Sequence, residues 1–231
     1  KIPAIPRGAL GNPLQDIKEG LKFIKVHSVF SFLISMTFFN SFFGMAYVML
    51  MPIFAVDILD VGAKGQGLLL GMSGAGALVN TLYIGARGSV PHRGLAIIAG
   101  AVLFGLAVAA FALTAEYVGS LSLAMGLMFI MGIFNSLYMI SIQSSLQMMV
   151  PDPIRGRVMG FYGMTWSIMP LGGLQASALT SIWNAPIAIA AGGLAVAPFA
   201  LGTSLFNSTV RNLSSNLSPI IDEAPQDTAL E

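Results

Sequence analysis

Uncharged polar residues recur at helical spacing in two long apolar stretches of this sequence, and the chemistry they offer is hydrogen bonding. Those of the first stretch fall at positions i, i+3, i+7 and i+10, and those of the second share a helix face in the same way. The two faces consist of Thr37, Asn40, Gly44 and Tyr47, and of Gly132, Ser136, Gln143 and Gln147. Hydroxyl and amide groups among apolar residues need hydrogen-bond partners. Such faces therefore point into a helix bundle or toward a water-filled cavity.

Two interpretations of these polar faces stay open. Hydrogen bonds between helices, worth about 0.6 kcal/mol each, explain any single residue. A cavity explains the combination of two striped helices better, and a third stretch carries a comparable face with Ser73, Gly76, Asn80 and Tyr83. The side chains that we expect to line a substrate cavity are Thr37, Asn40, Tyr47, Ser136, Gln143 and Gln147.

The sequence lacks the residue combinations that catalysis or metal binding requires. Gly71-Met72-Ser73-Gly74 matches the Gly-x-Ser-Gly string of rhomboid-type intramembrane proteases, but a serine nucleophile needs a base within hydrogen-bond reach. The two histidines, His27 and His92, lie near predicted helix ends on the cytoplasmic side. Cysteine is absent, and there is no cluster of metal-binding residues and no phosphate-binding Gly-rich loop. We expect no enzyme, no metal and no cofactor.

Long uncharged stretches are the elements that must position the polar faces. They cover 26–56, 65–86, 94–115, 117–151 and 158–210, and each reaches the ~20 residues that cross a bilayer core. The last divides at Trp183-Asn184-Ala185-Pro186. The predicted spans are 29–56, 65–86, 94–114, 118–149, 158–182 and 186–207. Polar faces in the first and fourth spans, with apolar third and sixth spans expected to face lipid, predict an all-α polytopic membrane protein of two three-helix repeats.

The basic residues predict the orientation of the spans. Ten of the eleven Lys and Arg residues lie before the first span or after the second, fourth and sixth, and Lys64 is the exception. Short basic loops stay on the cytoplasmic side. We therefore expect a multi-pass protein of the plasma (inner) membrane with both termini in the cytoplasm. The net charge is only +1, and the basic residues are spread over four loops instead of forming a patch, so nucleic-acid binding has no support.

The two ends of the chain differ from the apolar centre. Residues 1–28 are predicted to form a cytoplasmic linker, in which apolar residues at helical spacing over 12–27 oppose several lysines. This pattern favours an amphipathic helix in the membrane interface, and a solvated linker helix is the alternative. Residues 208–231 predict a disordered cytoplasmic tail. Because the chain begins at Lys1, without an initiator Met, we expect a fragment of a longer protein.

Small residues and prolines add expectations about packing. Gly67 and Gly71, like Gly156 and Gly160, lie four residues apart, and such pairs let helix backbones approach closely. We expect these four glycines to pack against other helices. Pro52 and Pro170 fall inside the first and fifth spans and are expected to bend them.

The most specific string joins the fourth and fifth spans and reads Pro151-Asp152-Pro153-Ile154-Arg155-Gly156-Arg157. Its two prolines force a turn because neither can donate a backbone hydrogen bond. Asp152 can cap a helix or pair with an arginine. Arg155 and Arg157 can anchor the loop to lipid headgroups or latch a cytoplasmic gate, and both roles stay open.

This string, preceded by Gln147 and followed by Val158-Met159-Gly160, resembles the loop between the tenth and eleventh helices of major facilitator superfamily transporters. The likeness is closest to the branch of enterobactin-exporter-like proteins, the transmembrane secretion effectors. The segment from Ile17 to Ile24 resembles the linker before that branch's seventh helix, and Asn40, Pro52 and Gly67-Leu68-Leu69 fit as well. The loop from Arg87 to Gly94 lacks the Asp of the superfamily's Asp-Arg-x-Gly-Arg signature, so the resemblance does not extend to a charge relay there.

The resemblance implies that the six spans are helices seven to twelve, the C-terminal half of a twelve-helix transporter. It implies a secondary active exporter of small amphipathic molecules that works by alternating access. Its partners would be the lipid bilayer, a small-molecule substrate and an N-terminal six-helix half that this chain lacks. The alternative function is a non-transporting membrane scaffold, or a degenerate half-transporter that binds a partner protein.

Overall fold

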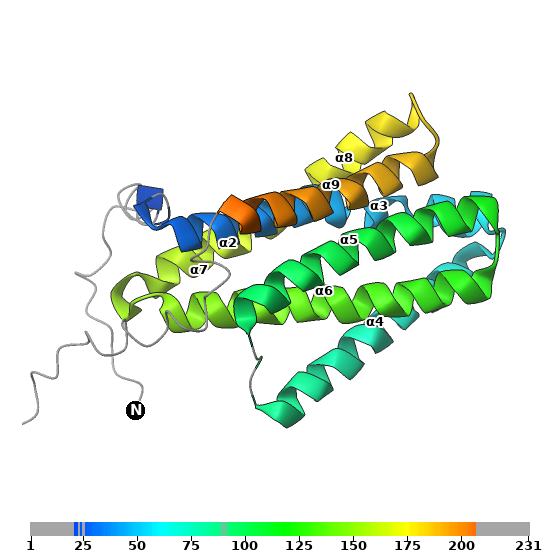
Figure 1. The fold of residues 1–231 in the computed structure, drawn as a ribbon. Helices are drawn as coiled ribbons and strands as arrows, with labels where there is room; N and C mark the ends of the chain where they lie inside the picture. Colours follow the sequence, from blue (N-terminus) through cyan, green and yellow to red (C-terminus); the bar gives the residue numbers. More distant parts are fainter. Residues whose placement is uncertain (1–20, 23, 25, 89, 91, 207–231) are drawn as a thin grey trace, which may run out of the picture.

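The computed structural model describes residues 21–22, 24, 26–88, 90 and 92–206, and these are almost entirely helical (Figure 1). The elements are α2 (Ser28–Phe39), η2 (Asn40–Gly44), α3 (Ala46–Ile53), η3 (Phe54–Ile58), α4 (Gly62–Arg87), α5 (Arg93–Tyr117), α6 (Leu121–Met149), α7 (Asp152–Trp166), α8 (Met169–Thr180) and α9 (Ala185–Phe206). Five stretches within the described part are long and apolar enough to cross a membrane, namely Ser28–Ile58, Gly62–Arg87, Arg93–Tyr117, Leu121–Met149 and Ala185–Gly202. The predicted class, an all-α polytopic membrane protein, is confirmed.

The first crossing is one helix with two π-helical turns. The Met45 N–H donates to the Asn40 carbonyl at 2.9 Å, and the Leu59 N–H donates to the Phe54 carbonyl at 2.9 Å. Each bond spans five residues instead of four, so each π turn holds one extra residue. Because one residue turns a regular helix by about 100°, side chains after Asn40 leave the face that regular spacing predicts. The stripe from Thr37 to Tyr47 is therefore not one continuous face.

The predicted span 158–182 corresponds to two helices. The regular α-helix stops at Trp166 and resumes at Met169, although Ser167 and Ile168 between them keep backbone angles in the right-handed helical region. Pro170 supplies the reason, because its ring clashes with the carbonyl four residues earlier, at Trp166, and it has no N–H to donate to that carbonyl. The proline that was expected to bend this span thus accompanies a break in it. α8 packs against η2 and α3.

α5 is the central helix of the described bundle. Figure 1 shows it between α6 and α9, with α4 on the other side of α6. In its most apolar stretch 61% of the residues are buried, against 17% for α4. The expectation that this third span faces lipid is wrong, because most of its apolar stretch is buried against α6 and α9. Its uniform apolarity serves this contact with two neighbouring helices.

Glycines allow the helices to cross at backbone contact. A Cβ atom at Gly76 of α4 would collide with the Phe129 carbonyl of α6, and one at Gly132 of α6 would collide with the Ser73 carbonyl of α4. Gly105 of α5 and Gly193 of α9 face each other in the same way. Gly100 brings α5 against α6, where a Cβ would lie 3.0 Å from the Tyr138 nitrogen. Small residues are what let helix backbones approach this closely in membranes.

The four glycines expected to pack lie elsewhere. Apart from the neighbouring turns of the same helix, no described atom comes within 4 Å of a Cβ built at Gly67, Gly71, Gly156 or Gly160. They take no part in helix packing within the described part of this chain. That these glycines pack against a helix outside the described part of the chain stays a prediction.

Replacing Gly132 with alanine should separate α4 from α6. The new methyl group meets a backbone carbonyl that cannot move aside, and such overpacking costs about 1–3 kcal/mol. Thermal unfolding in detergent measures the loss. Gly126→Ala is the matched control on the same helix, because open space surrounds its Cβ position. Equal stability of the two variants would contradict the observed crossing.

Candidate substrate site

Asn40 lies fully buried in the first π turn without hydrogen-bond partners for its side chain. Neither its amide nitrogen nor its amide oxygen has a partner among the described residues, and the same holds for the neighbouring Ser41 hydroxyl. Gly44 makes room for the amide, since a Cβ there would lie 2.6 Å from the Asn40 Oδ1 atom and 3.1 Å from the Phe104 ring. Leaving such a group unpaired costs about 1–3 kcal/mol. Polar groups buried inside membrane helices often mark solute pathways.

Two further unpaired polar atoms belong to α6. They are the Asn135 Oδ1 atom and the Tyr138 hydroxyl, both buried and without a hydrogen-bond partner in the described structure. Tyr138 shares an apolar cluster with Leu33 and Met36 of α2, the helix that carries Thr37, so this part of α6 lies beside α2. Thr37 itself is satisfied, because its hydroxyl donates to the Leu33 carbonyl at 2.9 Å. Unpaired polar atoms thus occur on the two elements, the first span and α6, that the sequence singled out.

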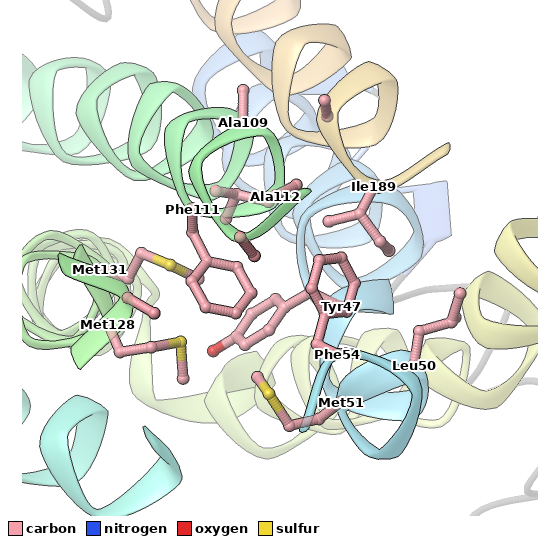
Figure 2. Close-up of a cluster of buried hydrophobic side chains, with 14 of the residues drawn as sticks. Tyr47, Leu50, Met51, Phe54, Ala109, Phe111, Ala112, Met128, Met131 and Ile189 are labelled. Carbon is pink, nitrogen blue, oxygen red and sulfur yellow. The ribbon is translucent and has the colours of Figure 1, made fainter. Parts of the chain in front are cut away.

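Tyr47 lies in a different environment from Asn40. It is buried in an apolar cluster with Phe54, Phe111 and Met128, which Figure 2 shows around its ring. Its ring meets the Phe104 ring edge-on, with the centroids 6.3 Å apart. The π turn between positions 40 and 47 accounts for the difference, since it rotates the helix that follows. Both residues lie near the Phe104 ring, but only Tyr47 belongs to the apolar cluster.

Ser136 belongs to a polar seam between α4 and α6. We use this name for Asn80, Thr81, Ser136 and the Ala77 carbonyl. The Ser136 hydroxyl receives a hydrogen bond from the Asn80 amide at 3.2 Å, lies 3.1 Å from the Thr81 hydroxyl, and donates to the Ala77 carbonyl at 3.3 Å. At Ser136, therefore, the polar face of α6 makes hydrogen bonds to a neighbouring helix and does not line a cavity.

Gln143 and Gln147 are exposed on the C-terminal half of α6. Gln147 lines a hollow of about 400 Å³ together with Ser144 of α6 and Arg93 of α5. Their amide groups can reach a solute without a change in the bundle, whereas the Asn40 amide cannot. The six expected cavity residues therefore fall into separate environments in this conformation, and the structure does not bring them together.

The loop that resembles the transporter signature begins α7. Asp152 is the first residue of that helix, and the placement of its side chain lies outside the described structure. The Arg155 guanidinium donates to the Val150 carbonyl at 3.2 Å, which ties the start of α7 to the end of α6. Arg157, in the first turns of α7, is partly exposed. Anchor and gate both stay predictions for this loop.

Sequence reasoning missed several polar residues of these surfaces. Ser41, Asn135 and Tyr138 fall outside the striped faces. Only the fold reveals that the Ser41 and Tyr138 hydroxyls and the Asn135 Oδ1 atom are buried without partners among the described residues. Asn80 was visible on the third polar face, but its bond to Ser136 depends on how α4 crosses α6. The described residues contain no group of three or more His, Cys, Asp or Glu that could hold a metal ion.

A double-mutant cycle tests the polar seam. Asn80→Ala and Ser136→Ala should be coupled by about 0.6 kcal/mol, and by at most about 1.7 kcal/mol, the range found for hydrogen bonds between membrane helices. Unfolding in mixed micelles measures the coupling. The control cycle pairs Asn80 with Ser145, whose hydroxyl bonds to the Ser141 carbonyl of its own helix at 2.7 Å. Additive effects in both cycles would show that the seam bond does not form.

Comparison with known proteins places the chain in a family. No curated protein sequence and no solved structure matches it. The sequence profile of the transmembrane secretion effectors, a family of the major facilitator superfamily, matches residues 5–228, nearly the whole chain. The chain belongs to the transmembrane secretion effector family of membrane transporters.

Proposed function

We propose that this chain forms the C-terminal half of a secondary active exporter of small amphipathic molecules. An N-terminal half of six further helices would complete it, with the substrate site near the bilayer midplane between the halves. Membership in the secretion effector family supports a transport role. The observation that carries the proposal is the buried Asn40 amide, which has no hydrogen-bond partner in the described structure.

Alternating access gives the unpaired amide a use. In one state of the cycle the amide is dry and unpaired, and in the other it meets water or substrate and gains hydrogen bonds. The free energy of that gain favours the open state, so substrate shifts the balance between the two. The π turns at Asn40–Gly44 and Phe54–Ile58 are suitable places for the first crossing to bend. Gln143 and Gln147 would meet the substrate from α6.

The coupling group is proposed to lie in the other half. Among the described residues, no Asp, Glu, Lys, Arg or His lies deep inside a membrane-crossing helix. Proton-coupled transporters use titratable groups within the membrane. We propose no catalytic activity for this chain, because the polar groups of its described residues can bind a solute but include no paired nucleophile and base.

Asn40→Leu should separate transport from stability in the complete transporter. Leucine has nearly the shape of asparagine, so it removes two unpaired polar atoms without opening a cavity. We expect stability to stay equal or to rise by about 1–3 kcal/mol while export falls at least about tenfold. Thermal unfolding and cellular accumulation of an exported compound measure the two effects.

Asn80→Leu is the matched control for that experiment. The same change there breaks the bond to Ser136, so stability should fall. If export by Asn40→Leu is unchanged, Asn40 does not belong to the substrate site. If Gln143→Ala also left export intact, the cavity wall would be wrong and the scaffold alternative would gain.

The proposed orientation puts both termini in the cytoplasm of cells whose plasma (inner) membrane holds the protein. Because the chain has no cysteine, single cysteines report on it directly. A membrane-impermeant maleimide should label Val118→Cys, between α5 and α6, in intact cells. It should label Ala224→Cys only after the membrane is permeabilised. The reverse pattern would invert the topology.

A further inference from the structure

A basic hollow lies where α4, α5 and α6 meet near the α4–α5 connection. Its volume is about 400 Å³, and a smaller one of about 220 Å³ beside it shares Ile84 and Val90 as lining residues. In Figure 1 the C-terminal end of α4 stands away from α6. The larger hollow, called the basic hollow from here on, is lined by both faces of that gap, with Gly85 and Gly88 from the α4 side, Arg93 from α5, and Ser144, Gln147 and Met148 from α6.

The positive charge around the basic hollow is not neutralised by the described residues. The Arg93 Nη1 atom contacts the Met148 sulfur at 2.6 Å, and a thioether is only a weak acceptor. The Arg87 guanidinium lies 4.5 Å from the centre of the Tyr83 ring and lines the smaller hollow. In the described part of the chain no carboxylate pairs with either arginine. Arg93, Ser144 and Gln147 together offer donors to a single anionic group.

The end of α4 does not oppose an anion as strongly as an open helix end would. The last carbonyls of a helix carry partial negative charge. Here the Gly88 N–H donates to the carbonyls of Ile84 and Gly85, at 3.1 and 3.2 Å. Gly88 can close the helix in this way because its φ of 71° lies in the left-handed region.

The surroundings of the basic hollow indicate what kind of anion it takes. Arg87 and Arg93 mark the ends of two membrane-crossing helices, so the hollow lies at the boundary between hydrocarbon and water. Beside it, α4 exposes large apolar side chains at Leu78, Val79 and Leu82. A ligand that joins an anionic group to long apolar chains matches both surfaces, whereas a free anion matches only the first.

We propose that the basic hollow binds the phosphate of an anionic phospholipid headgroup, with the acyl chains along the exposed face of α4. Arg93 would hold phosphate oxygens, since a guanidinium matches phosphate geometry with paired hydrogen bonds. Ser144 and Gln147 would donate further bonds. The site does not depend on the direction of transport or on the exported compound.

Lipid retention by the purified full chain tests the proposal. The protein is assembled in nanodiscs of phosphatidylcholine containing a minor fraction of phosphatidylglycerol, and native mass spectrometry counts the lipids that stay bound after release. We expect phosphatidylglycerol to be retained preferentially and Arg93→Gln to weaken this about fivefold. Lys64→Gln, which removes an exposed charge at the opposite end of α4, should leave retention unchanged. Arg93→Lys keeps the charge and should bind better than Arg93→Gln, which separates lost binding from lost folding.

A phosphate arm distinguishes the two sources of the anion. In nanodiscs of phosphatidylcholine alone, adding inorganic phosphate should leave the unfolding temperature of the wild-type chain unchanged. In nanodiscs that also contain phosphatidylglycerol, the unfolding temperature should be higher. Equal stabilisation by inorganic phosphate would overturn the lipid assignment in favour of a free anion. Equal retention of phosphatidylglycerol by wild type and Arg93→Gln would overturn the site.

Discussion

Backbone contact at glycine crossings is the constraint on which the rest of this structure depends. Lipid tails are as apolar as the helices, so burial of apolar surface does little to hold membrane helices together, and close packing must do so. Gly76 and Gly132 fix α4 on α6, and Gly105 and Gly193 fix α5 on α9. A side chain at these crossings would separate the helices and with them the polar groups between them. The packing therefore decides which polar side chains find partners.

Because of those crossings, some polar side chains of the bundle are hydrogen-bonded and others are not. Near the α4–α6 contact, Ser136 reaches Asn80 and the Ala77 carbonyl, so the polar seam is satisfied. In the π turn of the first crossing, the Asn40 side chain lies against Gly44 and has no hydrogen-bond partner in the described part of the chain. Satisfied groups stabilise the bundle, while an unpaired amide lowers the stability of this conformation relative to one that hydrates it. That contrast connects the fold to the proposed transport cycle.

Hydrophobic runs predicted most of the helices, because a membrane-crossing helix must be long enough to span the bilayer core. The ends of α4, α5, α6 and α9 lie within a few residues of the predicted ones, and the family resemblance is confirmed. The π turns were not predictable, since a bond over five residues depends on tertiary packing that regular spacing does not contain. Nor could the sequence tell Gly67 and Gly71, which face open space, from Gly76 and Gly132. The sequence singled out the polar Asn40, but it could not show that its amide is buried without a partner among the described residues, nor that Tyr47 lies in an apolar cluster.

Accessibility of position 40 to water tests the central claim most directly. In the complete transporter with Asn40→Cys as its only cysteine, a small water-soluble thiol reagent should label the protein while the two states interconvert, and binding of an exported compound should slow the labelling. Leu33→Cys is the reference, because it is as fully buried on the same crossing but belongs to an apolar cluster. We predict labelling at 40 and none at 33. Equal protection of both positions under all conditions would contradict the account, since the Asn40 amide would then never meet solvent or substrate.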